Sequence, residues 1–260
     1  MKLTTQIKSG ILKFFDQIGD LSFFLGRFFK EFLKPPYEFS ELLHQCYNVG
    51  NRSLPLVGIT GFIIGLVLTL QTRPTLEEFG AVSWMPNMVG ISIVREIGPV
   101  IVALICAGRV ASGMGAELGS MRVTEQIDAM EVSGTNPFKF LVVTRILATM
   151  LMLPLLVLLG DAFALYGSFL VENIKGEVSF ALYFNKVFES LGFSDLIPAV
   201  IKSFFFGLAI GLVGCYKGYY CKKGTVGVGM AANTAVVMAS MLIFIIDFVA
   251  VFISDIFYEL

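Results

Sequence analysis

Five long apolar stretches constrain the fold of this chain more than any other feature. A helix needs about 20 mainly apolar residues to cross the hydrocarbon core of a bilayer, and backbone inside lipid must satisfy its own hydrogen bonds. Each stretch therefore predicts one transmembrane helix. The composition agrees, because 56% of the 260 residues are hydrophobic and 15% are charged, which is unusual for a soluble domain. The five predicted spans are residues 53–72, 88–112, 140–171, 196–220 and 229–256.

The segment before the first span predicts a different kind of helix. Its apolar residues recur at helical spacing between charged ones, the pattern of an amphipathic helix lying in the membrane interface. A helix packed on a partner protein would show the same pattern. Lys34-Pro35-Pro36 ends the segment, since proline disfavours helical backbone. We predict an N-terminal interfacial region at 1–52 and a five-span membrane domain at 53–260. The apolar face is Ile11, Phe14, Phe15, Ile18, Leu21, Phe24, Leu25, Phe28 and Phe32.

Basic residues set the expected orientation. Lys and Arg gather in the N-terminal region, between Arg109 and Arg145, and at Lys217, Lys222 and Lys223. The positive-inside rule then places the N-terminus and the second and fourth loops in the cytoplasm and the C-terminus outside. Charged residues interrupt every apolar run before residue 53, so we expect no cleaved signal peptide.

Several function classes are disfavoured. A net charge of -1 offers no basic surface for nucleic acid. The four cysteines form no CxxC pair and the one histidine, His44, lies outside the spans, so we expect neither a metal site nor a histidine-based catalytic site. The chain lacks a GxxxxGK[ST] loop and cannot cradle nucleotide phosphates itself. We therefore expect no catalytic residue and no cofactor in this chain.

The loop between the second and third spans is more ordered than a connector requires. In residues 113–139, a short helix would align Val123, Ile127 and Met130 on one face, beside acidic residues. Ser133-Gly134 would end it, and Asn136-Pro137 would cap the next span. Two interpretations remain open: a docking helix whose apolar residues fill a groove on a cytoplasmic protein, or a surface helix packed on its own bundle.

Arg95 and Glu96 stand side by side in the second span, just before Gly98-Pro99. Charged residues inside a membrane normally face a cavity or a partner. Pro99 and Gly98 predict a kink or a new helix start. The pair could bind a lipid headgroup, form pairs between helices or subunits with Asp247 as the candidate partner of Arg95, or lie at the outer interface.

Other features of the spans suggest packing. Asp161 and Lys202 predict inter-helix pairs or side chains that reach to the interface. Glycines recur four apart at residues 61 and 65, 207 and 211, and 214 and 218, which allows close approach of helices.

The run REIGPVIVALICAGRVASGMGAELGSMRVTEQIDAMEVSGTNPFKFLVVTRILATMLMLPLL, residues 95–156, resembles the core of the MlaE (YrbE) permease family. A second block, GVGMAANTAVVMASMLIFIIDFVA at 227–250, resembles the last span of that family. Ile97, Ser133 and Asn136 depart from the residues common there. These permeases are the membrane subunits of lipid ABC transporters that work with MCE-domain proteins.

The resemblance implies a fold, partners and sites. It implies an all-α protein of the inner membrane with an interfacial helix, five spans and a cytoplasmic coupling helix. It also implies a homodimer, a cytoplasmic ATPase subunit that binds ATP, and an MCE-domain protein on the outer face. The coupling helix would carry Glu117, Arg122, Glu125, Gln126, Asp128 and Glu131. The lipid cavity would be lined by Arg95, Glu96, Leu68, Gln71, Thr75, Leu76, Phe79 and Ile97.

Two functions from different classes follow. The first is the permease of an ATP-driven transporter for phospholipid or a related lipid. The alternative is a secondary transporter or channel driven by an ion gradient, with Glu96 and Asp247 as ion or proton sites. The ordered cytoplasmic loop favours the first, because a self-contained carrier does not require a docking helix.

Overall fold

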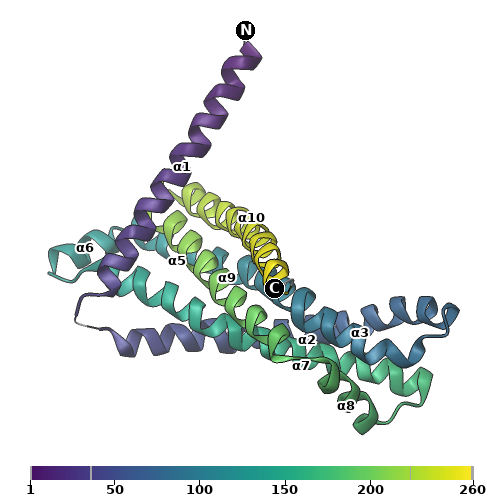
Figure 1. The fold of residues 1–260 in the computed structure, drawn as a ribbon. Helices are drawn as coiled ribbons and strands as arrows, with labels where there is room; N and C mark the ends of the chain where they lie inside the picture. The colour runs from purple at the N-terminus through teal and green to yellow at the C-terminus, as the bar shows by residue number, and fades with distance from the viewer. Residues whose placement is uncertain (1, 36, 223, 259–260) are drawn as a thin grey trace.

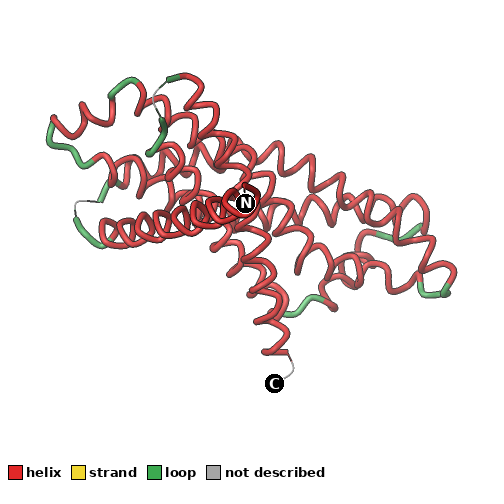
Figure 2. Tube along the Cα trace, turned by 90° about the horizontal axis from the view of Figure 1, so that it is seen from above, coloured by secondary structure: helices red, strands yellow, loops and turns green. Residues whose placement is uncertain are grey.

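The computed structural model describes the backbone of residues 2–35, 37–222 and 224–258, and their side chains except those of residues 2–15, 18, 257 and 258. Within these ranges the chain forms helices joined by short loops, without strands (Figure 2). Four residues of the predicted apolar face have side chains outside the described set: Ile11, Phe14, Phe15 and Ile18. The prediction of an all-α protein is confirmed.

Five stretches are long and apolar enough to cross a membrane, and each coincides with one of the predicted windows. The first span is the helix α2 (Phe39–Glu78), the fourth is α9 (Phe193–Tyr219) and the fifth lies in α10 (Thr225–Tyr258). The third comprises η4 (Phe138–Val143) and α7 (Thr144–Gly176). Five spans were therefore predicted correctly.

The first span begins earlier than predicted. Helix α2 is continuous from Phe39 and passes through Pro55, so the predicted boundary between residues 52 and 53 falls inside it. Apolar patterning marks only the part of a helix that meets lipid or core. It does not detect the polar turns that precede that part in the same hydrogen-bonded helix.

The second span is built from six helical segments in series. These are η1 (Val82–Trp84), α3 (Met85–Ser92), η2 (Ile93–Ile97), α4 (Gly98–Cys106), η3 (Ala107–Ala111) and α5 (Ser112–Val123), the first of which is a 3-10 turn that leads into the span. Segments η2 and η3 are π-helical, a geometry often found at functional sites. The irregularity predicted at Gly98-Pro99 occurs here as a π-helical turn before α4.

Helix α7 lies at the centre of the bundle, between α2 and α9, and α9 also packs on α5 and α10 (Figure 1). The predicted glycine pairs lie at these contacts. A Cβ on Gly65 would overlap the Ala164 carbonyl of α7, and one on Gly207 would overlap the Thr149 carbonyl. Gly218 meets α5 in the same way. The small residues thus allow close packing within the chain.

Helix α1 (Lys2–Phe32) extends away from the bundle, and its C-terminal part contacts η4 and α9 (Figure 1). Phe24 and Phe28 are buried there, and Phe24 makes edge contacts with Phe138 and Tyr216. Phe23 and Phe29 are exposed. One side of the helix therefore packs on its own bundle, and other phenylalanines remain available for lipid.

A second core closes the end of the bundle formed by α2, α3, α7 and α8 (Phe180–Ser190). The Tyr183 hydroxyl donates to Ser168 Oγ at 2.7 Å, and Thr69 lies 2.6 Å from the same oxygen. Burial raises the pKa of Tyr183 to about 12, against a smaller opposing effect of its hydrogen bond to Ser168. Nearby, Arg73 binds the buried Glu172 at 2.8 Å. These contacts fix α8 against the spans.

Candidate transport site and coupling segment

Lys202 of α9 is the centre of a charge cluster inside the bundle. Its side chain is 4% exposed, and its Nζ lies 2.7 Å from Glu96 Oε2 and 3.1 Å from Asp247 Oδ1. The three residues come from the second, fourth and fifth spans. Buried charges are tolerated when paired and hydrogen-bonded. The cluster therefore ties three spans together by electrostatics rather than by apolar packing.

Arg95 extends the cluster towards the end of α10. Its Nη2 lies 3.6 Å from Asp255 Oδ1, and its Nε lies 3.9 Å from Glu96 Oε1. Adjacent side chains on an α-helix diverge by about 100°, which disfavours such an approach. Both residues lie in π-helical η2, where each turn holds more residues and the angle between neighbours is smaller.

The sequence suggested Asp247 as the partner of Arg95, and the structure pairs each of them differently. Asp247 binds Lys202, while Arg95 contacts Asp255 and Glu96. Asp247 and Lys202 thus form an ion pair between the fifth and fourth spans. The choice of partner depends on the register between distant helices, which hydropathy does not specify.

Asp161 of α7 lies close to this cluster. Its side chain is buried and packs against Gly98, where a Cβ would overlap Oδ1. That oxygen has no hydrogen-bond partner among the described residues, although Lys202 is near enough to interact with it electrostatically. Gly98 is thus required by close approach of a carboxylate as well as by the helix irregularity at Pro99.

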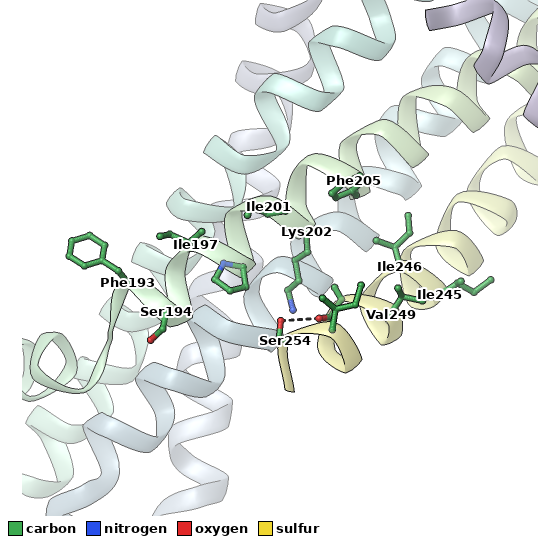
Figure 3. Close-up of a pocket in the computed structure, with 13 residues that line it drawn as sticks. Phe193, Ser194, Ile197, Ile201, Lys202, Phe205, Ile245, Ile246, Val249 and Ser254 are labelled. Carbon is green, nitrogen blue, oxygen red and sulfur yellow. Dashed lines mark hydrogen bonds between the residues drawn. The ribbon is translucent and has the colours of Figure 1, made fainter. Parts of the chain in front are cut away.

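A cavity of 730 Å³ opens between α9 and α10, directly beside Lys202. Its walls are mainly apolar and include Phe193, Ile197, Phe205, Ile245 and Val249. Figure 3 shows the Lys202 side chain extending from α9 among these residues, with Ser254 below it. A cavity with apolar walls and a cationic group at one side has the chemistry to hold an amphipathic molecule.

Most of the residues predicted to line a lipid cavity lie away from this one. Arg95 and Glu96 border a small pocket next to the larger one. The remaining six do not line the 730 Å³ cavity. Leu76 is buried in the second core, Leu68 and Ile97 are half-buried, and Gln71, Thr75 and Phe79 are exposed at the far end of α2. Those three exposed side chains can line a cavity only if another molecule covers them.

The loop between the second and third spans differs from a single coupling helix spanning residues 117–131. Helix α5 ends at Val123, Glu125 has a left-handed backbone with φ of 60°, and α6 runs from Gln126 to Val132. Arg122 and Asp128 form an ion pair across this turn. The predicted end at Ser133-Gly134 is confirmed, as is the cap, because the Lys139 amide donates to Asn136 Oδ1 at 3.3 Å.

The faces of α6 also differ from the predicted arrangement. Ile127 is fully buried in the main core and Met130 packs against it, so they are not available to fill a groove on another protein. The exposed face carries Val132, which is 90% exposed, and acidic side chains. The exposed polar residues are Glu125, Gln126, Asp128 and Glu131. Val123 is half-buried at the end of α5.

Glu117 has a partner within the chain. Its Oε1 lies 2.8 Å from Nη2 of Arg145, whose side chain is buried at the start of α7. Arg145 also donates to the Leu141 carbonyl. Glu117 therefore neutralises a buried cation of the third span, a contact the sequence interpretation missed. The signal was present, since an arginine early in an apolar span requires a counter-charge.

No group of three or more His, Cys, Asp or Glu residues suited to a metal ion occurs among the described residues. The cysteines Cys46, Cys106, Cys215 and Cys221 are free.

Comparison with known proteins places this architecture in a family. The model of the Permease MlaE family matches residues 42–253. A probable ABC transporter permease protein of Rickettsia prowazekii is 37% identical over 100% of this chain and 99% of its own length. A probable ABC transporter permease protein of Synechocystis is 33% identical over 90% and 89%. The intermembrane phospholipid transport system permease protein MlaE of Haemophilus influenzae is 30% identical over 92% of both chains. This chain belongs to the MlaE permease family.

Proposed function

We propose that this chain is the transmembrane permease subunit of an ABC transporter that moves phospholipid, or a related lipid, between the inner membrane and an MCE-domain partner. ATP would be bound and hydrolysed by a separate cytoplasmic ATPase subunit, so this chain itself would not be an enzyme. The observation that carries the proposal is the 730 Å³ apolar cavity beside a buried, three-span charge cluster, in a chain of this family. The phospholipid transport system of Haemophilus influenzae supports the substrate class.

The permease would act as a homodimer. Helix α10 supports this proposal, because it exposes a long apolar face that includes Phe244, Phe248 and Phe252. Only 11% of its most apolar window is buried inside the protomer. A second copy against this face would enclose the cavity between α9 and α10. It would also give the exposed Gln71, Thr75 and Phe79 a neighbour.

The charge cluster suits a transporter that changes shape. Lys202 satisfies two carboxylates on different spans, and such a pairing can be exchanged for another when helices shift. Lipid would enter the apolar cavity with its headgroup near Lys202 and Arg95, since both can bind phosphate. Movement of the ATPase subunits would then be transmitted to these spans through α5 and α6.

The orientation expected from the basic loops is consistent with an ATPase on one side of the membrane and an MCE-domain partner on the other. With the N-terminus in the cytoplasm and the C-terminus outside, α6 faces the ATPase and the end of the bundle that holds α3 and α8 faces the MCE-domain partner. This orientation is inferred from the basic residues in the loops, which favour the cytoplasmic side. The N-terminal helix would lie in the cytoplasmic interface, with its exposed phenylalanines in the acyl region.

Co-purification tests the proposal. The permease, expressed with its neighbouring genes, should bring an ATPase chain that releases phosphate. Reversing Glu125 and Glu131 to Lys should remove that chain, because both side chains are exposed on α6. Glu189→Lys is the matched control, an exposed carboxylate on α8 at the opposite end. If no ATPase accompanies the unmodified permease, the proposed function is wrong.

A further inference from the structure

Arg52 and Arg109 form a pair of cations at one boundary of the apolar zone. The chain carries no charge from Ser53 to Thr72, nor from Ile97 to Gly108, and the two arginines end these runs. They lie on the same side of the membrane because Arg109 Nη1 donates to Ser53 Oγ at 2.5 Å, which joins η3 to α2. The two positive charges are near enough to repel one another.

No carboxylate neutralises this pair. Among the described residues, neither arginine has an Asp or Glu oxygen within 4.0 Å. The contrast with Arg73, Arg95, Arg122 and Arg145 is clear, since each of these has an acidic partner. Cations in a membrane-spanning segment normally face a partner of opposite charge. An anion from outside the chain would supply the partner that these two cations lack among the described residues.

The guanidinium of Arg109 is held in place by one hydrogen bond and keeps other N–H donors for a ligand. Ser53 is fully buried and directs its own proton to the Val49 carbonyl at 2.6 Å, so its oxygen is a fixed acceptor for one Arg109 donor. A guanidinium carries five N–H donors, and most of these remain for a ligand. The Arg109 side chain is partly exposed, so a ligand from outside the chain can reach it.

We infer that Arg52, Arg109 and Ser53 form a binding site for the phosphate group of an anionic glycerophospholipid at the membrane boundary. Two forked cations favour a phosphate that can accept several N–H donors. Basic pockets between spans on the cytoplasmic side are typical sites for anionic headgroups. A zwitterionic headgroup fits less well, because its ammonium group would be repelled by the second arginine.

This site differs from the cavity beside Lys202. The cavity lies between α9 and α10, whereas Arg52 and Arg109 lie on α2 and η3. The inference rests on the proposed function only in placing the site at the inner leaflet. Lipid bound there could enter transport or hold the π-helical turn of the second span in position. The binding chemistry is the same in both cases.

Lipid binding to the purified, full-length permease in detergent tests the inference. Native mass spectrometry should show tighter binding of phosphatidylglycerol than of phosphatidylcholine. Arg52→Gln and Arg109→Gln should each weaken phosphatidylglycerol binding about five-fold. Lys222→Gln is the control, because it removes an exposed charge, as Arg52→Gln does, from the loop before α10 and should leave binding unchanged. Ser53→Ala should weaken binding less than Arg109→Gln does, since it loosens the guanidinium and keeps its charge.

Two results would overturn the inference. Equal binding of both lipids, unaffected by the arginine variants, would show that the pair does not hold a headgroup. Displacement of phosphatidylglycerol by inorganic phosphate or glycerol phosphate would assign the site to a soluble phosphate compound. The assay contains no ATPase, so a failure of the proposed transport function leaves its outcome unchanged. Thermal unfolding of each variant separates lost binding from lost folding.

Discussion

Lys202 Nζ lies 2.7 Å from Glu96 Oε2, joining the fourth span to the π-helical turn of the second through residues 106 positions apart. Asp247 completes the cluster from the fifth span. One ammonium group therefore connects three spans. The predictions below follow from that connection, from the close packing of α2 on α7, from the surface of α6 and from the buried Tyr183.

Lys202→Met should destabilise the permease. Removing one partner of a fully buried ion pair costs about 3–5 kcal/mol, and we expect a smaller loss here, because the Glu96 and Asp247 side chains that stay behind are 39% and 22% exposed. Thermal unfolding in detergent should show a lower midpoint for Lys202→Met than for Lys222→Met. The triple variant with Glu96→Gln and Asp247→Asn should recover most of the loss. An unchanged midpoint for Lys202→Met would mean that the cluster is solvated.

Gly65→Ala should disrupt the packing of α2 on α7. The added Cβ would overlap the Ala164 carbonyl, and backbone cannot give way cheaply, so a loss of about 1–3 kcal/mol is expected. Gly108→Ala provides the control, since a Cβ there meets nothing within 4 Å and alanine favours helix by about 1 kcal/mol. Unfolding in detergent should separate the two variants in opposite directions. Equal stability would contradict the close approach of these helices.

Val132→Ser should weaken binding of the ATPase without affecting the fold. Val132 is a large apolar residue exposed on α6, and losing a well-buried interface side chain costs about 1–2 kcal/mol, or roughly ten-fold in affinity. Val226→Ser is the matched control, because Val226 is also exposed and begins α10. Titration of the ATPase subunit onto the immobilised permease measures the effect. Equal loss in both variants would place the contact elsewhere.

The Tyr183 phenol should remain protonated well above pH 10. Burial raises its pKa to about 12, compared with about 10 in an unfolded chain. Between these values the unfolded state releases the proton first, so stability is complete below pH 10 and falls as the pH rises towards 12. The difference in phenolate absorbance between the wild type and Tyr183→Phe reports the titration. A transition near pH 10 would show that α8 does not bury Tyr183 against the spans.

The spans were predictable because their length and hydropathy are dictated by the bilayer itself. The glycine contacts and the end of α6 before Ser133-Gly134 also follow from local chemistry. The partners of Arg95, Glu117 and Lys202 could not be predicted, because each pair joins distant helices whose relative rotation is not encoded in any short stretch. The left-handed backbone at Glu125 was also missed, since glutamate seldom adopts it.

The packing of the predicted coupling segment, residues 117–131, could not be predicted from the sequence either. Its periodicity correctly indicated an apolar face formed by Ile127 and Met130, but periodicity cannot say whether such a face meets the parent bundle or another protein. Burial of Ile127 settles that question in favour of the bundle. The cavity between α9 and α10 was not predicted either, because its walls are ordinary apolar span residues.

The most direct test measures movement of a fluorescent phospholipid in proteoliposomes that contain the permease, its ATPase and the MCE-domain partner. The account predicts movement that requires hydrolysable ATP, stops when ATP is replaced by a non-hydrolysable analogue, and is unaffected when the proton gradient is collapsed. Movement that continues without ATP and disappears with the ion gradient would contradict it, and would identify a carrier driven through Glu96 and Asp247 instead.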